Sequence, residues 1–94
     1  MSNVSRREVV LVQSFLTCYS YGMGGIWFLL KAPSYIQAKQ AYPEFAVFET
    51  KPDWMTEEDE EKYRSDLIQK DRVWNVEIPP SGWFKGLVDE VRKG

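Results

Sequence analysis

The chain has 94 residues, which is the size of one small domain, so we expect a single globular domain over residues 1–94. Hydrophobic residues make up 44% and charged residues 28%, a balance that excludes collagen-like, disordered and disulfide-scaffold proteins. There is one cysteine and no histidine, so an internal disulfide cannot form and the most common metal ligand is missing. We expect no metal and no cofactor, and an enzyme is the least favoured class because the usual general base is absent.

The formal net charge is −2, and the basic residues are scattered apart from the pairs at 6–7 and 92–93. Proteins that bind nucleic acid usually carry a basic excess on one face, so we expect no nucleic-acid partner. The longest apolar run, residues 26–30, is far shorter than the roughly 20 residues that a membrane-spanning helix needs, so we expect no membrane segment.

The first residues allow two interpretations. Arg6 and Arg7 precede an apolar stretch that runs to Cys18, which resembles a twin-arginine export signal. Gln13 and Ser14 interrupt that stretch and no small-residue cleavage site follows it, so we favour a first strand. A lone cysteine without a signal then indicates a cytoplasmic protein.

Residues 9–20 and 26–32 are rich in β-branched and aromatic side chains, which favours two strands. The glycine-rich residues 21–25 join them and predict a β-hairpin, because glycine reaches positive φ at little cost. A phosphate-binding loop is the alternative. However, the segment lacks the Lys and Ser/Thr of such loops and leads into a strand instead of a helix.

A first helix is predicted after Pro33. Ser34 can cap it, with Gln37 at the capping-box position, and Pro43 ends it near Tyr42. A short third strand is predicted over residues 45–49.

Thr56 and Asp59 form a capping pattern that predicts the start of a second helix. Its apolar stripe is thin, mainly Tyr63 and Leu67, which is typical of a surface helix with one buried edge. Two pairs of opposite charge lie four residues apart along it, Glu58–Lys62 and Glu60–Arg64.

Residues 72–78 alternate in character and predict a fourth strand, with Trp74 facing the core. Two prolines end this strand, and Ser81 is placed to cap a last helix. Trp83 begins an apolar face of that helix, which should dock on the sheet.

These elements predict an α+β fold in the order β-β-α-β-α-β-α. We expect a four-stranded mixed sheet with an N-terminal hairpin and helices packed mainly on one face. If the right-handed crossovers progress in one direction, all helices cover one face and the other is open to water or to a partner.

An acidic cluster beside a tryptophan is the candidate binding surface. Metal binding is disfavoured because consecutive helical residues point in different directions, and a solvated helix start is the plain alternative. Six clustered negative charges, with Asp53 included, would speed association with a basic partner, and a tryptophan in a turn beside them is a typical interface anchor. The candidate partner-binding residues are Trp54, Glu57, Glu58, Asp59, Glu60 and Glu61.

Cys18 is the only thiol, and no basic residue next to it in the sequence could activate it. We interpret it as a small buried apolar residue and not as a nucleophile. No catalytic residues are therefore predicted.

Four short motifs of the chain resemble those of a group of short, uncharacterised bacterial proteins. They are YGMGGIW at 21–27, YPEFAV at 42–47, PDWM at 52–55 and PSGW at 80–83. The resemblance implies a compact bacterial domain and carries no activity and no functional residues.

We predict a non-enzymatic protein-interaction module. An immunity or inhibitor protein, which neutralises a partner through the acidic, tryptophan-containing surface, is one form that such a module takes. The alternative is a small-molecule-binding or regulatory domain that uses an open sheet face or the glycine hairpin. A homodimer formed through an exposed strand edge is compatible with both.

Overall fold

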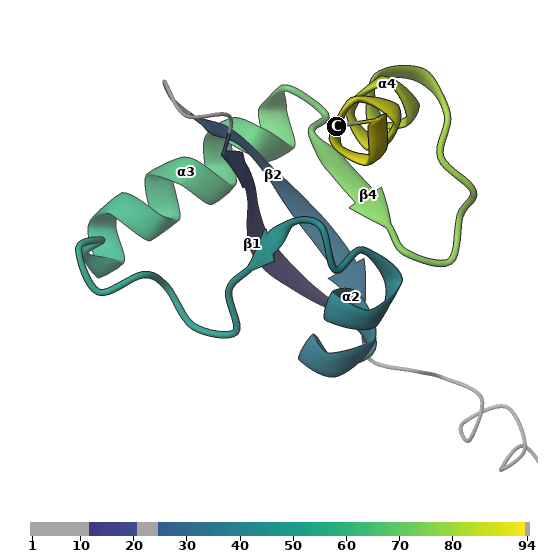
Figure 1. Ribbon diagram of the computed structural model, residues 1–94. Coiled ribbons are helices and arrows are strands. Elements are labelled where there is room, and N and C mark those ends of the chain that lie inside the picture. Colours follow the sequence, from purple (N-terminus) through teal and green to yellow (C-terminus); the bar gives the residue numbers. More distant parts are fainter. Residues whose placement is uncertain (1–11, 21–24, 94) are drawn as a thin grey trace, which may run out of the picture.

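The computed structural model describes residues 12–20 and 25–93 (Figure 1). Its elements follow the predicted order β-β-α-β-α-β-α, so the α+β class is confirmed. In chain order they are β1 (Gln13–Ser20), β2 (Gly25–Ala32), α2 (Tyr35–Ala41), β3 (Ala46–Val47), α3 (Glu57–Gln69), β4 (Val73–Asn75) and α4 (Gly82–Lys93).

The sheet has the strand order β3-β1-β2-β4. β1 pairs antiparallel with β2 and with β3, and β2 pairs parallel with β4, so the predicted mixed sheet is confirmed. The β1–β2 register runs from Gln13 opposite Ala32 to Ser20 opposite Gly25, which confirms the two strands of the N-terminal hairpin. The hairpin loop at 21–24 and the predicted strand start at 9–11 lie outside the described residues.

Alternate side chains of the central strands enter two separate clusters, one on each face of the sheet. Phe15 and Phe28 belong to the larger cluster, which α2 and α4 cover. Leu16 and Leu29 belong to the smaller cluster, together with Leu67 from α3. Two of the three helices therefore pack on one face, as predicted, and α3 lies on the other (Figure 1).

The expectation of a fully open second face was conditional on crossovers in one direction, and that condition is not met. From β2 to β3 the chain crosses the sheet past β1, and from β3 to β4 it crosses back past β1 and β2. Two crossovers of the same hand that run in opposite directions place their helices on opposite faces. α3 therefore covers part of the face that was expected to be open.

Side-chain caps fix where the first two helices begin. Ser34 accepts a hydrogen bond from the backbone N–H of Gln37, and Tyr42 is the C-cap of α2, both as predicted. Thr56 and Asp59 form a complete, reciprocal capping box at the start of α3. α4 starts directly after Ser81, but in the described structure the Ser81 side chain forms no hydrogen bond to it.

The fourth strand is shorter than predicted, because it ends at Asn75 instead of residue 78. The side-chain oxygen of Asn75 accepts a hydrogen bond from the backbone N–H of Glu77 at 2.9 Å, and its carbonyl accepts one from Ile78. This local turn competes with the sheet for the backbone. Trp74 and Trp83 pack against the larger cluster, as predicted.

Candidate functional site

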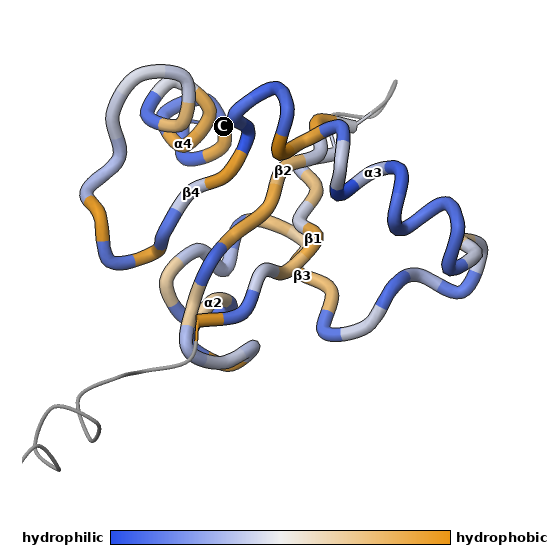
Figure 2. Tube along the Cα trace, turned by 180° about the vertical axis from the view of Figure 1, so that it is seen from behind, coloured by the Kyte–Doolittle hydropathy of each residue, from blue (hydrophilic) through white to orange (hydrophobic). Residues whose placement is uncertain are grey.

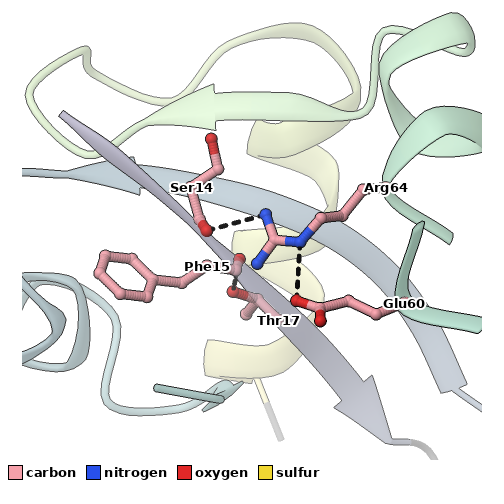
Figure 3. Close-up of polar contacts among 5 residues, drawn as sticks. All are labelled: Ser14, Phe15, Thr17, Glu60 and Arg64. Atoms are coloured by element: carbon pink, nitrogen blue, oxygen red, sulfur yellow. Dashed lines mark hydrogen bonds and ion pairs between the residues drawn. The ribbon is translucent and has the colours of Figure 1, made fainter. Parts of the chain in front are cut away.

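α3 is held to the sheet by apolar contacts and by one arginine. Tyr63 and Leu67, one helical turn apart, pack into the smaller cluster. The Arg64 guanidinium donates to the backbone carbonyl of Ser14 in β1 and to the Glu60 carboxylate, both at 3.0 Å (Figure 3). These contacts fix which side of α3 faces outward.

The five predicted acidic residues divide into two groups by their contacts. Asp59 is part of the capping box, and Glu60 forms the predicted ion pair with Arg64. The side chains of Glu57, Glu58 and Glu61 are exposed and form no ion pair or hydrogen bond within the described structure, so the predicted Glu58–Lys62 pair does not form. Three carboxylates are therefore available to a partner.

The charge of the chain is concentrated around this helix. Residues 53–66 contain seven acidic and two basic residues, a formal charge of −5. Because the whole chain carries −2, the remainder carries +3. Figure 2 shows α3 as a largely hydrophilic helix beside the apolar strands. An uneven distribution of this kind orients an approaching charged partner.

Trp54 lies on an aromatic assembly that the sequence did not reveal. Trp27 of β2 stacks on Tyr63, with ring centroids 5.5 Å apart, and on Phe48 at 5.8 Å. The Trp54 ring meets Trp27 edge-on at 6.1 Å, yet 63% of Trp54 is exposed. Trp54 is therefore supported from one side and open to solvent on the other.

The turn that carries Trp54 is anchored on both sides of the exposed indole. Pro52 is buried, and its carbonyl accepts a hydrogen bond from the backbone N–H of Met55 at 3.0 Å. The Met55 side chain is 1% exposed and lies in the smaller cluster. Because the turn is anchored in this way, less backbone entropy is lost when Trp54 binds a partner.

Two open hollows flank α3. One, of about 390 Å³, is lined by Trp54 and Tyr63 together with Asp59, Lys62 and Asp66. The other, of about 740 Å³, lies between the segment 49–51 and α3, and its lining includes the remaining four predicted acidic residues, Glu57, Glu58, Glu60 and Glu61. Of the five predicted carboxylates, only that of Asp59 shares a hollow with Trp54.

Features of the described residues bear on metal binding, on thiol reactivity and on membrane crossing. No group of three or more His, Cys, Asp or Glu side chains in residues 12–20 and 25–93 could hold a metal ion. Cys18 is half-buried, not buried as predicted. Its partial burial raises the pKa of the thiol, which disfavours the reactive thiolate. Among the helices of the described segments, none has the length and apolar character needed to cross a membrane.

Sequence reasoning missed three members of the site. Trp27 was placed in the second strand without a choice of face, and Tyr63 on the apolar stripe of the second helix. Their contact joins β2 to α3, which no local pattern can predict. Asp66 lies seven residues after Asp59, hence on the same side of the helix, and that spacing was a usable signal.

Comparison of the chain with protein-family models, with curated proteins and with solved structures found no match. The resemblance to short bacterial proteins therefore stays a prediction.

Proposed function

We propose that this protein is a non-enzymatic interaction module that binds a basic protein partner through Trp54 and the exposed carboxylates of α3. The observation that carries the proposal is the 63% exposed Trp54 indole, held on Trp27 beside a segment of charge −5. Tryptophan is enriched among residues that dominate binding energy, and surrounding charge increases association rates.

An immunity or inhibitor protein is the form of this function that we favour. Such a protein covers the basic active surface of a toxin or nuclease, and the free carboxylates of Glu57, Glu58 and Glu61 offer the complementary charge. A bacterial source and a cytoplasmic location belong to the same proposal, since the single thiol of Cys18 fits a reducing compartment.

The test is affinity capture from cells of the source organism, with quantitative mass spectrometry of the bound proteins. Two variants are compared with the unchanged protein, Trp54→Ala and the double variant Glu57→Lys/Glu61→Lys. We expect both to lose the same basic protein, with only slightly lowered unfolding temperatures. All three side chains are exposed, so the losses are limited to one edge contact with Trp27 and to the favourable charge at the start of α3.

The matched control is Glu77→Lys/Glu90→Lys, which makes the same charge change at exposed positions outside α3. It should retain the partner. Equal capture by the control, by Trp54→Ala and by the double variant of α3 would refute the proposed surface.

A second candidate function rests on a different hollow. Between α3 and β4 lies an open space of about 580 Å³, lined by the half-buried Val73 and, at its base, by the buried Leu29. Ile68 and Ile78 border it and are 62% and 51% exposed. The lining also includes Lys31, Asp71 and Asn75, so the ligand that fits is a small molecule with both apolar and polar groups. A thermal-shift screen against metabolites would detect it, because a ligand of the native state raises the melting temperature.

A further inference from the structure

We infer that the hollow beside Trp54 is a subsite for one arginine side chain of the basic partner. This inference rests on the proposed function and specifies the chemistry that the surface recognises. The hollow combines two aromatic side chains, Trp54 and Tyr63, with two carboxylates, Asp59 and Asp66. Aromatic faces and carboxylates together are the surroundings that a planar cation prefers.

The aromatic side of the subsite is built on Trp27. Tyr63 stacks on Trp27 with their planes 26° apart, and Trp54 meets the same Trp27 ring at 75°. The indole of Trp54 is thus in contact with Trp27 while most of Trp54 is exposed to solvent. An arginine side chain can lie along such surfaces with its apolar stem, while its guanidinium contacts the ring faces.

Both carboxylates of the subsite have an oxygen that can still accept a hydrogen bond. Asp59 uses Oδ2 to accept from the Thr56 backbone N–H at 3.3 Å, and Asp66 uses Oδ2 to pair with Lys70 at 3.2 Å. Within the described structure each carboxylate thus keeps its Oδ1 without a partner. A guanidinium presents several N–H donors in one plane, whereas a lysine ammonium is a compact and strongly hydrated charge. The subsite should therefore prefer arginine to lysine.

Among the described residues, Lys62 is the one basic residue that lines the hollow. A change at Lys62 therefore tests whether the ligand is positively or negatively charged. If a cation binds there, Lys62 repels it, and Lys62→Gln should strengthen binding. If the hollow takes an anion or a neutral group, the same change should weaken binding or leave it unaltered.

The probe is an amidated nine-residue peptide with three arginines separated by glycine and serine. Two matched peptides replace arginine with lysine or with citrulline, which has the shape of arginine without its charge. Titrations are followed by two-dimensional ¹H–¹⁵N NMR, which resolves the tryptophan indole N–H groups and the backbone amides. We expect the arginine peptide to shift the Trp54 indole and the amides around Asp59, Tyr63 and Asp66.

The variants separate the subsite from general attraction to the acidic helix. Trp54→Ala should lower the affinity for the arginine peptide about two- to fivefold, which is the effect of losing one exposed cation–π contact. Asp66→Asn should also weaken it, and Lys62→Gln should strengthen it. Glu57→Gln/Glu61→Gln alters the other hollow and should change binding by less than twofold at physiological salt, where exposed charges are screened.

Equal binding of the citrulline peptide, or shifts centred on residues 49–51, would overturn the inference. So would the absence of shifts at millimolar peptide. Failure of the peptide to bind, with capture of a partner still lost in Trp54→Ala, would overturn the arginine subsite and leave the proposed function standing. Arginine binding, with capture unaltered in both Trp54→Ala and Glu57→Lys/Glu61→Lys, would support the subsite and refute the proposed partner surface.

Discussion

At the scale of single residues, two glycines of α4 differ in backbone conformation, and alanine should have opposite effects on stability at the two positions. Gly82, at the first position of the helix, has φ of +56°, whereas Gly86 lies within the helix. A Cβ at either position would meet no atom within 4 Å, so only backbone conformation distinguishes them.

We expect Gly82→Ala to lower the free energy of unfolding by about 1–2 kcal/mol, the cost of the left-handed conformation for an L-residue. Gly86→Ala should raise it by up to about 1 kcal/mol, because alanine favours a helix interior. Urea unfolding of the two variants measures both changes. Shifts of the same sign would contradict the assigned conformations.

The structural role of Gly25 could not be predicted from the sequence. The glycine-rich pattern placed it in a loop, where it would serve a turn, but it is the first residue of β2. A Cβ there would lie 2.7 Å from the Cys18 sulfur on the neighbouring strand. Its role is thus close approach between strands, which depends on a register that the sequence does not display.

At the scale of elements, Arg64 joins α3 to the sheet and is the most informative side chain to remove. Arg64→Ala breaks the contact with the Ser14 carbonyl as well as the ion pair with Glu60. We expect a loss of about 1–2 kcal/mol in unfolding free energy, because a partly buried hydrogen bond from a charged donor to a backbone carbonyl is lost.

Lys70→Ala is the matched control, because Lys70 pairs with Asp66 on the same helix with both side chains more than half exposed. Exposed pairs of this kind contribute roughly 0–1 kcal/mol, so the control should cost less. Chemical denaturation monitored by circular dichroism compares the two. An equal cost for both variants would show that Arg64 does not anchor the helix.

Element boundaries were predictable where a local signal acts alone. Ser34 and the Thr56–Asp59 box fixed helix starts correctly, because capping depends on residues within one turn. The end of β4 was not predictable from alternation, because the Asn75 side chain draws the backbone into a turn. The site was predictable only in part, since the exposure of Trp54 depends on Trp27, which is distant in sequence.

At the scale of the whole molecule, an ion pair links the last helix to the segment before β3. Arg92 of α4 donates to the Glu44 carboxylate at 2.9 Å and lies over the Tyr42 ring at 5.6 Å. The hydrogen bond from Arg92 lowers the pKa of Glu44 below its ordinary value of 4.5. A carboxylate with a lowered pKa in the folded state stabilises the fold above its ordinary pKa, and this contribution is lost as pH falls through the lowered value.

We therefore expect Glu44→Gln to be less stable than the unchanged protein at pH 7, by no more than about 1 kcal/mol because the pair is partly exposed. The difference should shrink as pH drops below 4.5 and the Glu44 carboxylate takes up a proton. Urea unfolding at pH 7 and at acidic pH measures this. A difference that does not change with pH would contradict the proposed role of the charge.

Sheet order was the global feature that the sequence could not supply. The elements and their order followed from periodicity and turn residues, but the reversal of direction between the two crossovers depends on which strands become neighbours. That choice is made by long-range pairing, for example of Thr17 with Val47. The covering of the second face by α3 follows from it.

The reversal leaves the candidate surface on a small apolar cluster of its own, Leu16, Leu29, Met55 and Leu67, while the large aromatic cluster holds the opposite side together. In the proposed function, binding and the larger part of the core therefore lie on different sides of one sheet. Because Glu57, Glu58 and Glu61 form no ion pair or hydrogen bond within the described structure, we expect their replacement to cost little stability. The proposed surface could then change with its partner while the rest of the fold stays the same.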